Sequence, residues 1–262
     1  MVLDIGGEEY VSTYTSPAVG GNSYMICGYK KGYPLNALWG FKYAGVWHNQ
    51  EEVERNKVSK AMAGLTADQS LGTPRYYDIN HDGMLNMDDL CYLGNTDPIV
   101  YGGLGNNFRY KNFKLNVYFT YSLGGKIYNF SEFYMSGGSY TNQYRYMVNA
   151  WSQDRNPDSD LPRAGFYGIA APSDFMVHDA SFLRLQDVSF SYTIPFKDKN
   201  GKKKFLRDIT LTVSGNNLFL LTEYNGFDPD VSSQGTSSTV RRLDLGAYPK
   251  PRRFLFTLQV RY

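Results

Sequence analysis

The chain has 262 residues, with 27 Lys and Arg against 25 Asp and Glu, which gives a net charge of +2. With charges so nearly balanced, the sequence shows no basic stripe that would neutralise a row of phosphates. Nucleic acid is therefore not an expected partner. Aromatic residues make up 16% of the chain, but no run approaches the roughly 18 apolar residues that a membrane-spanning helix needs. Rings interleaved with polar residues are typical of strands that have one polar and one apolar face. Any membrane crossing would therefore be by strands.

The cysteines and the N-terminus give two further expectations. Cys27 and Cys91 lie far apart and form no CxxC spacing, so we expect packed thiols and no thiolate metal site or disulfide framework. Residues 1–13 lack the charged region and apolar stretch of a secretory signal. An exported protein would therefore carry its signal upstream of this sequence.

Residues 49–62 are polar and charged with few apolar anchors, which predicts a short surface helix. The segment DINHDGMLNMDD that follows, residues 78–89, has the spacing of an EF-hand calcium loop with Gly83 at its sharp turn. Its candidate ligands are Asp78, Asn80, Asp82, Met84 (through its backbone carbonyl), Asn86 and Asp89. Calcium, or magnesium less tightly, would take these oxygens as a structural ion. The alternative is a metal-free Asn/Asp/Gly turn whose side chains cap its own backbone.

Period-two alternation predicts strands along the rest of the chain. It is seen in residues 114–121, with 101–110 as a hairpin partner across Lys111 and Asn112, and again in 187–194 and 209–214. In the last segment, Phe254, Phe256, Leu258, Val260 and Tyr262 alternate with Arg253, Leu255, Thr257, Gln259 and Arg261. A soluble sandwich could hold such strands, but an amphipathic strand that ends on an aromatic residue favours an outer-membrane barrel.

The connections alternate between short links, at 111–112 and 196–206, and long ones, at about 124–179 and 220–252. Outer-membrane barrels combine short periplasmic turns with long external loops in this way. Counting from a periplasmic C-terminus makes the 124–179 loop external, together with the region before Tyr101. The Lys202–Lys204 run in the short link is expected to be a solvated turn.

The 124–179 loop is rich in rings that could stack on sugars or meet a partner protein, or could pack the loop onto itself. These candidate substrate-binding residues are Tyr128, Phe130, Phe133, Tyr134, Tyr140, Tyr144 and Tyr146.

No set of catalytic residues emerges from the sequence. His48, His81 and His178 share no spacing, and Asp158 and Asp160 are expected to be turn residues rather than a carboxylate pair for glycoside chemistry. The chain is therefore not expected to be an enzyme.

Six phrases stand in an order that resembles the C-terminal part of the SusC/RagA family of TonB-linked outer-membrane proteins. They are GYPLNALWGFKYAGVW (32–47), YYDINHDGMLNMDD (76–89), GNTDPIVYGGLGNNFRYKNFKLNVYFTYSLGGKIYN (94–129), DASFLRLQDVSFSYTIP (179–195), SGNNLFLLTEYNGFDPD (214–230) and LGAYPKPRRFLFTLQVRY (245–262). The resemblance covers nearly the whole chain.

This resemblance implies an all-β fold: residues 1–262 would supply the C-terminal antiparallel strands of a 22-stranded transmembrane β-barrel with long extracellular loops, one of them the EF-hand-like loop. The plug domain and the earlier strands have no counterpart in the sequence. The family implies the outer membrane of a Gram-negative cell as the location, a SusD-like surface lipoprotein as partner, and import of oligosaccharides or peptides. Energy would come from TonB, ExbB and ExbD through the missing N-terminal part.

One alternative function is a secreted calcium-dependent β-sandwich that binds carbohydrate. It would explain the strands and the loop at 78–89, and it would be soluble without detergent. A hydrolase would need an acid/base set, which the sequence does not offer.

Overall fold

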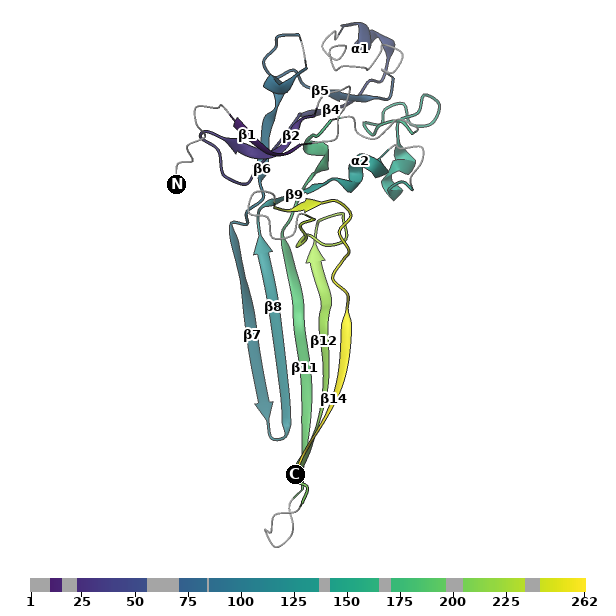
Figure 1. The fold of residues 1–262 in the computed structure, drawn as a ribbon. Helices are drawn as coiled ribbons and strands as arrows, with labels where there is room; N and C mark the ends of the chain where they lie inside the picture. The colour runs from purple at the N-terminus through teal and green to yellow at the C-terminus, as the bar shows by residue number, and fades with distance from the viewer. Residues whose placement is uncertain are drawn as a thin grey trace. The chain divides into compact units, whose positions relative to one another are not determined.

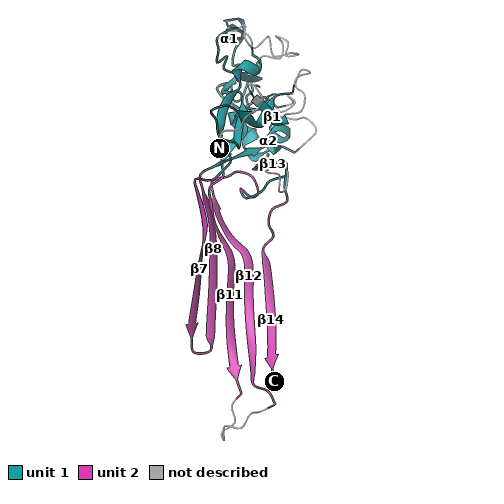
Figure 2. Ribbon diagram, turned by 60° about the vertical axis from the view of Figure 1, so that its left-hand side comes forward, with its two compact units in different colours: residues 1–97, 125–179, 230–247 teal, residues 98–124, 180–229, 248–262 magenta. Residues whose placement is uncertain are grey.

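The computed structural model describes residues 10–15, 23–55, 71–83, 85–136, 142–164, 171–196, 205–233 and 241–262. The chain divides into two compact units (Figure 2). The first comprises residues 1–97, 125–179 and 230–247, and the second comprises residues 98–124, 180–229 and 248–262. Within the described ranges, no helix is long and apolar enough to cross a membrane.

The second unit is a five-stranded antiparallel sheet with the strand order β14-β12-β11-β8-β7 (Figure 1). Its strands are β7 (Val100–Tyr110), β8 (Phe113–Leu123), β11 (Phe182–Pro195), β12 (Asp208–Thr222) and β14 (Arg253–Arg261). They contain 9 to 15 residues each, and a tilted strand needs about 9 to 11 residues to cross the hydrocarbon core of a bilayer. Each strand is therefore long enough to span a membrane.

The register of the sheet separates an apolar from a polar face. Residues that pair across neighbouring strands project to the same side of a sheet. One row across all five strands is Phe256, Val213, Phe190, Leu115 and Phe108. The adjacent row, on the opposite face, is Thr257, Thr212, Ser191, Lys114 and Arg109. In these two rows the alternation predicted for single strands continues in phase across all five strands.

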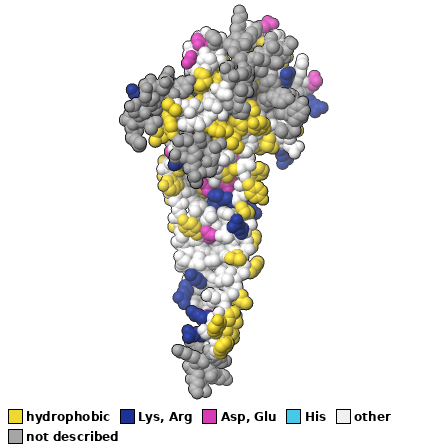
Figure 3. All heavy atoms as spheres, viewed as in Figure 1, with side chains coloured by type: hydrophobic (Ala, Val, Ile, Leu, Met, Phe, Trp, Pro, Cys, Tyr) yellow, Lys and Arg dark blue, Asp and Glu magenta, His cyan; other side chains and the backbone are white. Residues whose placement is uncertain are grey.

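Side chains on the polar face hydrogen-bond across the strands. The Asn116 amide donates to the Ser189 hydroxyl at 2.8 Å, and the Ser191 and Thr212 hydroxyls lie 2.9 Å apart. In the view of Figure 3, uncharged polar side chains and backbone cover much of this unit, with hydrophobic side chains along its margins. A shift of one residue would place these polar groups among the apolar rows, so the pairs help to fix the register.

The long connections all leave from one end of the sheet. Val100 at the start of β7 pairs with Leu123 at the end of β8, and Phe182 at the start of β11 pairs with Thr222 at the end of β12. At the other end, β7 and β8 are joined by Lys111 and Asn112 alone, with Lys111 in the left-handed region (φ 51°) that tight turns use. The predicted hairpin is confirmed, and the register gives the same alternation of long and short connections as the sequence.

A buried ion pair joins β11 to the segment after β12. Arg184 and Asp228 are 3% and 2% exposed, and a guanidinium nitrogen lies 2.6 Å from the carboxylate. The guanidinium also lies over the Phe182 ring, 5.3 Å from its centroid. Removal of one partner from such a pair leaves an uncompensated buried charge, so the pair holds residues 223–228 against the strand.

The first unit is built from short strands around a main core and a smaller cluster of buried hydrophobic residues. A four-stranded sheet has the order β1-β2-β3-β6, with β1 (Tyr10–Thr15), β2 (Met25–Lys30), β3 (Ala37–Gly40) and β6 (Cys91–Asn95). A second sheet pairs β9 (Lys126–Asn129) with β10 (Val177–Asp179) and, in parallel, with β13 (Leu243–Asp244). The third pairs β4 (Tyr43–Val46) with β5 (Pro74–Tyr76).

Helices of this unit are short: α1 (Gln50–Arg55), α2 (Ser131–Met135) and the 3-10 turns η3 (Met87–Asp89), η4 (Arg145–Asn149) and η5 (Asp174–Met176). Buried members of the core include Ile26, Leu38, Phe41, Tyr128, Met176 and Leu243. These residues come from distant parts of the sequence, so the first unit depends on long-range packing.

Several elements differ from the sequence-based prediction. The sheets of the first 97 residues were not predicted, because β2 and β3 have buried side chains in succession and so show no alternation. The expected helix at 49–62 is confirmed as far as Arg55, and residues 56–62 lie outside the described ranges. β11 and β12 extend several residues beyond the predicted 187–194 and 209–214.

A charge on the apolar face tests the assignment of faces. If this face meets lipid, an arginine near the middle of a bilayer costs about 2 to 4 kcal/mol, and one facing the lumen costs little. We expect Leu258→Arg in the full-length protein to reduce the amount of assembled, heat-modifiable barrel strongly. The neighbouring substitution Gln259→Arg should leave it near wild type. Equal losses from both variants would contradict the assignment.

Candidate functional site

Residues 78–89 form a tight turn held by their own side chains. Asp78 accepts hydrogen bonds from the backbone N–H groups of His81 at 2.7 Å and Gly83 at 2.9 Å. Asn80 accepts from the N–H of Asp82 at 3.0 Å. Gly83 has φ 82°, and its positive value produces the sharp turn at the position where an EF-hand loop has its glycine.

Asp89 links the two ends of this loop. Its carboxylate is fully buried and accepts from the backbone N–H groups of Ile79 at 2.8 Å and Asn80 at 3.4 Å with one oxygen, and from Asn86 at 2.9 Å with the other. Charged acceptors make hydrogen bonds of about 1.5 to 3 kcal/mol, so Asp89 stabilises the loop without any ion.

The metal prediction for this loop stays a prediction. Among the described residues, no group of three or more His, Cys, Asp and Glu side chains is arranged to hold a metal ion. The loop residues Asp78, Asn80, Asp82, Asn86 and Asp89 are all described, whereas Met84 lies outside the described ranges. Asp82 is exposed, Asp78 is half-buried and Asp89 is fully buried.

Most of the candidate aromatic residues of the 124–179 segment pack on one another or in the core. Tyr128 is fully buried and donates to the Met176 sulfur at 3.0 Å, and the Phe133 ring stacks on Phe130 at 5.3 Å. Tyr144 stacks on Tyr146 at 5.4 Å. These contacts belong to the packing of the segment on itself. Phe130 and Tyr134 also line a cavity, and Tyr140 lies outside the described residues.

A buried carboxylate links three parts of this segment. Glu132 on α2 is 1% exposed; one of its oxygens lies 2.6 Å from the His178 Nε2 and the other accepts from the Tyr146 hydroxyl at 3.1 Å. Burial, and then the nearby Glu132, raise the pKa of Tyr146, so its phenol stays protonated and can donate. The network fixes the position of α2.

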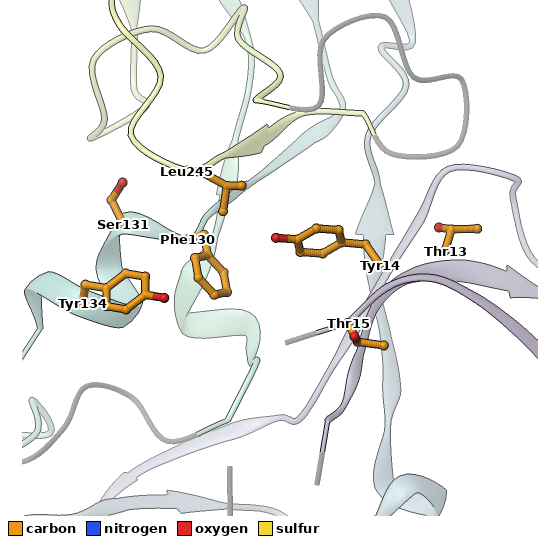
Figure 4. A pocket seen from close by; sticks show the side chains of 7 residues that line it. All are labelled: Thr13, Tyr14, Thr15, Phe130, Ser131, Tyr134 and Leu245. Carbon is orange, nitrogen blue, oxygen red and sulfur yellow. The ribbon is translucent and has the colours of Figure 1, made fainter. Parts of the chain in front are cut away.

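The cavity has a volume of about 620 Å³ and is lined by three distant segments (Figure 4). Its described lining residues are Thr13, Tyr14, Thr15, Phe130, Ser131, Tyr134 and Leu245. The described lining thus consists of two tyrosines, one phenylalanine, two threonines, one serine and one leucine. Its size lies in the range of about 300 to 1,000 Å³ that is typical of small-ligand sites.

Backbone pairing positions the wall of the cavity. β13 pairs in parallel with β9, and the Phe130 N–H extends this pairing by donating to the Asp244 carbonyl at 2.9 Å. The Asp244 carboxylate is buried and accepts from the N–H groups of Gly246 at 2.9 Å and Ala247 at 3.0 Å, which fixes the turn after Leu245. Burial, together with nearby Cys27 and Tyr134, raises the pKa of Tyr14, so the phenol is neutral.

The sequence identified two of these seven lining residues. Thr13, Tyr14, Thr15, Ser131 and Leu245 were missed because residues 13–15, 131 and 245 are brought together only by the tertiary fold. The YVSTYT segment of β1 carries a local signal, since its hydroxyl and ring side chains suit a polar wall, but nothing in it identifies the partners across the cavity.

The remaining candidate groups form no catalytic set in the described structure. His48 Nε2 lies 3.6 Å from Asp160, and His178 contacts Glu132, so the two histidines belong to separate clusters. Asp158 and Asp160 are both exposed. Burial raises the pKa of the Cys27 thiol to about 12, in agreement with a packed thiol.

Comparisons with known proteins identify the family. No family model matches the chain. The chain is 30% identical to TonB-dependent receptor P26 of Formosa agariphila over all of its length and 26% of the relative's. It is 31% identical to TonB-dependent receptor P3 of the same organism, over 89% of the chain and 23% of that relative. TonB-dependent receptor SusC of Bacteroides thetaiotaomicron is 25% identical over 82% of the chain and 21% of its own length.

Solved structures agree in fold. The RagAB peptide transporter matches 98% of the chain and 25% of its own chain, with a TM-score of 0.69 and 20% identity. The RagAB peptide importer in the open-open state matches all of the chain, again with a TM-score of 0.69. This likeness supports the predicted class of fold, antiparallel strands of an outer-membrane barrel, and leaves the number of strands in the barrel as an expectation.

The chain therefore belongs to the TonB-dependent receptors of the SusC/RagA type. It spans about a quarter of the length of the relatives it matches. These relatives are outer-membrane receptors and not enzymes, so the predictions on location and on enzymatic activity are confirmed. The alternative of a secreted β-sandwich has no support among them.

Proposed function

We propose that this chain is part of a transporter that imports an oligosaccharide or a peptide across the outer membrane. The sheet supplies part of the barrel wall, and the first unit supplies the external loops that meet the substrate. The observation that carries this proposal is the two-faced register of the five strands, found in a chain of the TonB-dependent receptor family. A polar face along a wall of this kind suits a watery passage.

The partners follow from the same family. We propose that a SusD-like surface lipoprotein covers the external loops, and that TonB, ExbB and ExbD supply energy through a part of the receptor outside this chain. The names SusC and RagAB among the similar proteins support this assembly, since RagAB is described as a peptide transporter. The segment between β8 and β11 and the one before β7 leave the same end of the sheet, which suits a common surface for one partner.

Uptake by cells tests this function. In a strain that carries the full-length receptor and lacks other copies, removal of residues 125–175 should abolish growth on the imported nutrient but leave barrel assembly largely intact. Replacement of residues 197–206, which join β11 to β12 in the sequence, by a short Gly-Asn link is the control and should preserve growth. Wild-type uptake after the first change would remove the loop from the mechanism. Saccharide hydrolysis by the purified chain would contradict the transporter function itself.

We further propose that residues 78–89 bind calcium, or magnesium less tightly, as a structural ion. The support is the spacing of the oxygen donors, together with the positive φ of Gly83, which gives the turn that such loops need. Asp78, Asn80 and Asp82 would hold the ion on the exposed side of the turn, and the Asp89 carboxylate would keep the loop ends together.

Calorimetry tests whether residues 78–89 bind calcium. Titration of calcium into the full-length receptor in detergent should release heat for wild type and none for Asp82→Ala. Asp88→Ala is the matched control, since Asp88 is an exposed carboxylate in the same loop that is not a predicted ligand. Identical traces for wild type and Asp82→Ala would overturn the proposal.

A further inference from the structure

Residues 223–228, which follow β12, are tied to the polar face of the five-stranded sheet. Arg184 on β11 pairs with Thr120 on β8, and Thr120 lies an even number of residues after Lys114 of the polar row. The side chain of Arg184 therefore leaves the sheet on the polar face, and its buried ion pair with Asp228 holds the segment there. This part of β11 lies at the end of the sheet from which the long connections leave, which is the external end in the proposed function.

Burial at this end of the sheet differs between the two faces. On β11, Phe182 and Arg184 of the polar face are 7% and 3% exposed, whereas Leu183 between them is 37% exposed. On β8, Ser122 of the polar face is 4% exposed and Leu123 of the apolar face is 51% exposed. The polar face is thus covered where the apolar face is open. Asp228 supplies part of this cover, since it lies against Arg184.

The segment is held in one conformation by its own contacts. The Tyr224 N–H donates to the Thr222 hydroxyl at 3.1 Å, and this hydroxyl donates to the Ser181 carbonyl at 2.8 Å. A Cβ at Gly226 would overlap the ring of the buried Tyr224, so the close approach at this point requires glycine. The segment is therefore ordered before any solute arrives.

Phe227 is a large apolar residue of this segment and is 73% exposed. The residues on both sides of it are held in place, Gly226 by its close approach to Tyr224 and Asp228 by the ion pair. Single exposed rings are common on protein surfaces. Here the backbone that carries the ring is fixed beside the polar face, so the ring has a defined position next to the wall of the proposed passage.

We propose that Phe227 narrows the external end of the passage and limits the size of the solutes that enter, with Arg184 as its positioning residue; the inference rests on the proposed function. The phenyl ring carries no charge and no hydrogen-bonding group, so it acts through its bulk. A buried ion pair adds little net stability, because both charges lose hydration, but breaking it leaves one charge uncompensated. The pair of Arg184 and Asp228 therefore serves to hold the segment in one position.

Labelling of intact cells tests the constriction. The reporter is Asn107→Cys in the full-length receptor, because Asn107 is an exposed residue of the polar face that lies further from the external end than Arg184. Cells are treated with N-ethylmaleimide or with a maleimide that carries a long polyethylene glycol chain. The receptor without the added cysteine gives the background. We expect N-ethylmaleimide to react with the reporter and the long reagent to react severalfold more slowly.

Phe227→Ala should raise the rate of the long reagent severalfold and leave that of N-ethylmaleimide unchanged, because it removes the bulk of the ring. Phe219→Ala is the matched control, since Phe219 is 52% exposed near the same end but pairs with Leu185 on the apolar face. This variant should be labelled as wild type is. Equal rates of the two reagents in wild type, or an unchanged rate of the long reagent in Phe227→Ala, would overturn the constriction.

The positioning role is tested with the charges of the ion pair. Arg184→Gln combined with Asp228→Asn leaves no charge uncompensated, so the barrel should assemble in its heat-modifiable form. The long reagent should nevertheless react as fast as in Phe227→Ala, whereas Arg184→Lys, which keeps the charge, should hold the rate near wild type. Failure of the double variant to assemble, or a wild-type rate in it, would remove Arg184 from this role.

Uptake separates the constriction from the proposed function. A receptor that imports its nutrient but shows no dependence of labelling on reagent size loses the constriction alone. Absence of uptake by the wild-type receptor counts against the function itself.

Discussion

The demand that every backbone N–H and C=O group find a partner inside a membrane governs the five-stranded sheet. Antiparallel pairing meets this demand for β8, β11 and β12 and for the inner edges of β7 and β14, with one register shift between Leu185 and Asp187 on β11. Because side chains alternate between the faces of a strand, the same pairing decides which residues share a face of the sheet. The row from Phe256 to Phe108 is therefore a consequence of the ladder, as is the polar row beside it.

In the proposed function, the segments that connect the strands meet the substrate. Side chains of these segments need not alternate between two faces of a sheet. The first unit is built instead from short strands, 3-10 turns and buried polar groups. The carboxylates of Asp89, Glu132 and Asp244 are buried, and each accepts hydrogen bonds. They therefore stabilise segments that contain little regular secondary structure. The cavity beside α2 depends on this arrangement, since Glu132 and Asp244 position its walls. The sheet thus has two regular faces, whereas the first unit holds individual side chains in fixed positions.

The sequence predicted the features that depend on neighbouring residues. The hairpin at Lys111 and the strand at 254–261 were predicted because alternation is visible within a single segment. β2 and β3 were missed, since strands buried on both faces lose the alternation. The loop at 78–89 was recognised by its spacing, but the hydrogen bonds of Asp89 to Ile79 and Asn80 could not be foreseen. Features that join distant segments, such as the Arg184–Asp228 ion pair and the cavity lined by Tyr14 and Tyr134, need the folded chain.

The central claim is that the apolar row of β14 faces lipid while its polar neighbours face the interior of a barrel. Nitroxide labels at positions 256 and 258, and at 257 and 259, in the full-length receptor reconstituted into bilayers test it by power saturation. Labels at 256 and 258 should be accessible to oxygen and shielded from a polar nickel relaxant, and those at 257 and 259 should show the opposite. A reversed pattern, or equal accessibility at all four positions, would contradict the account.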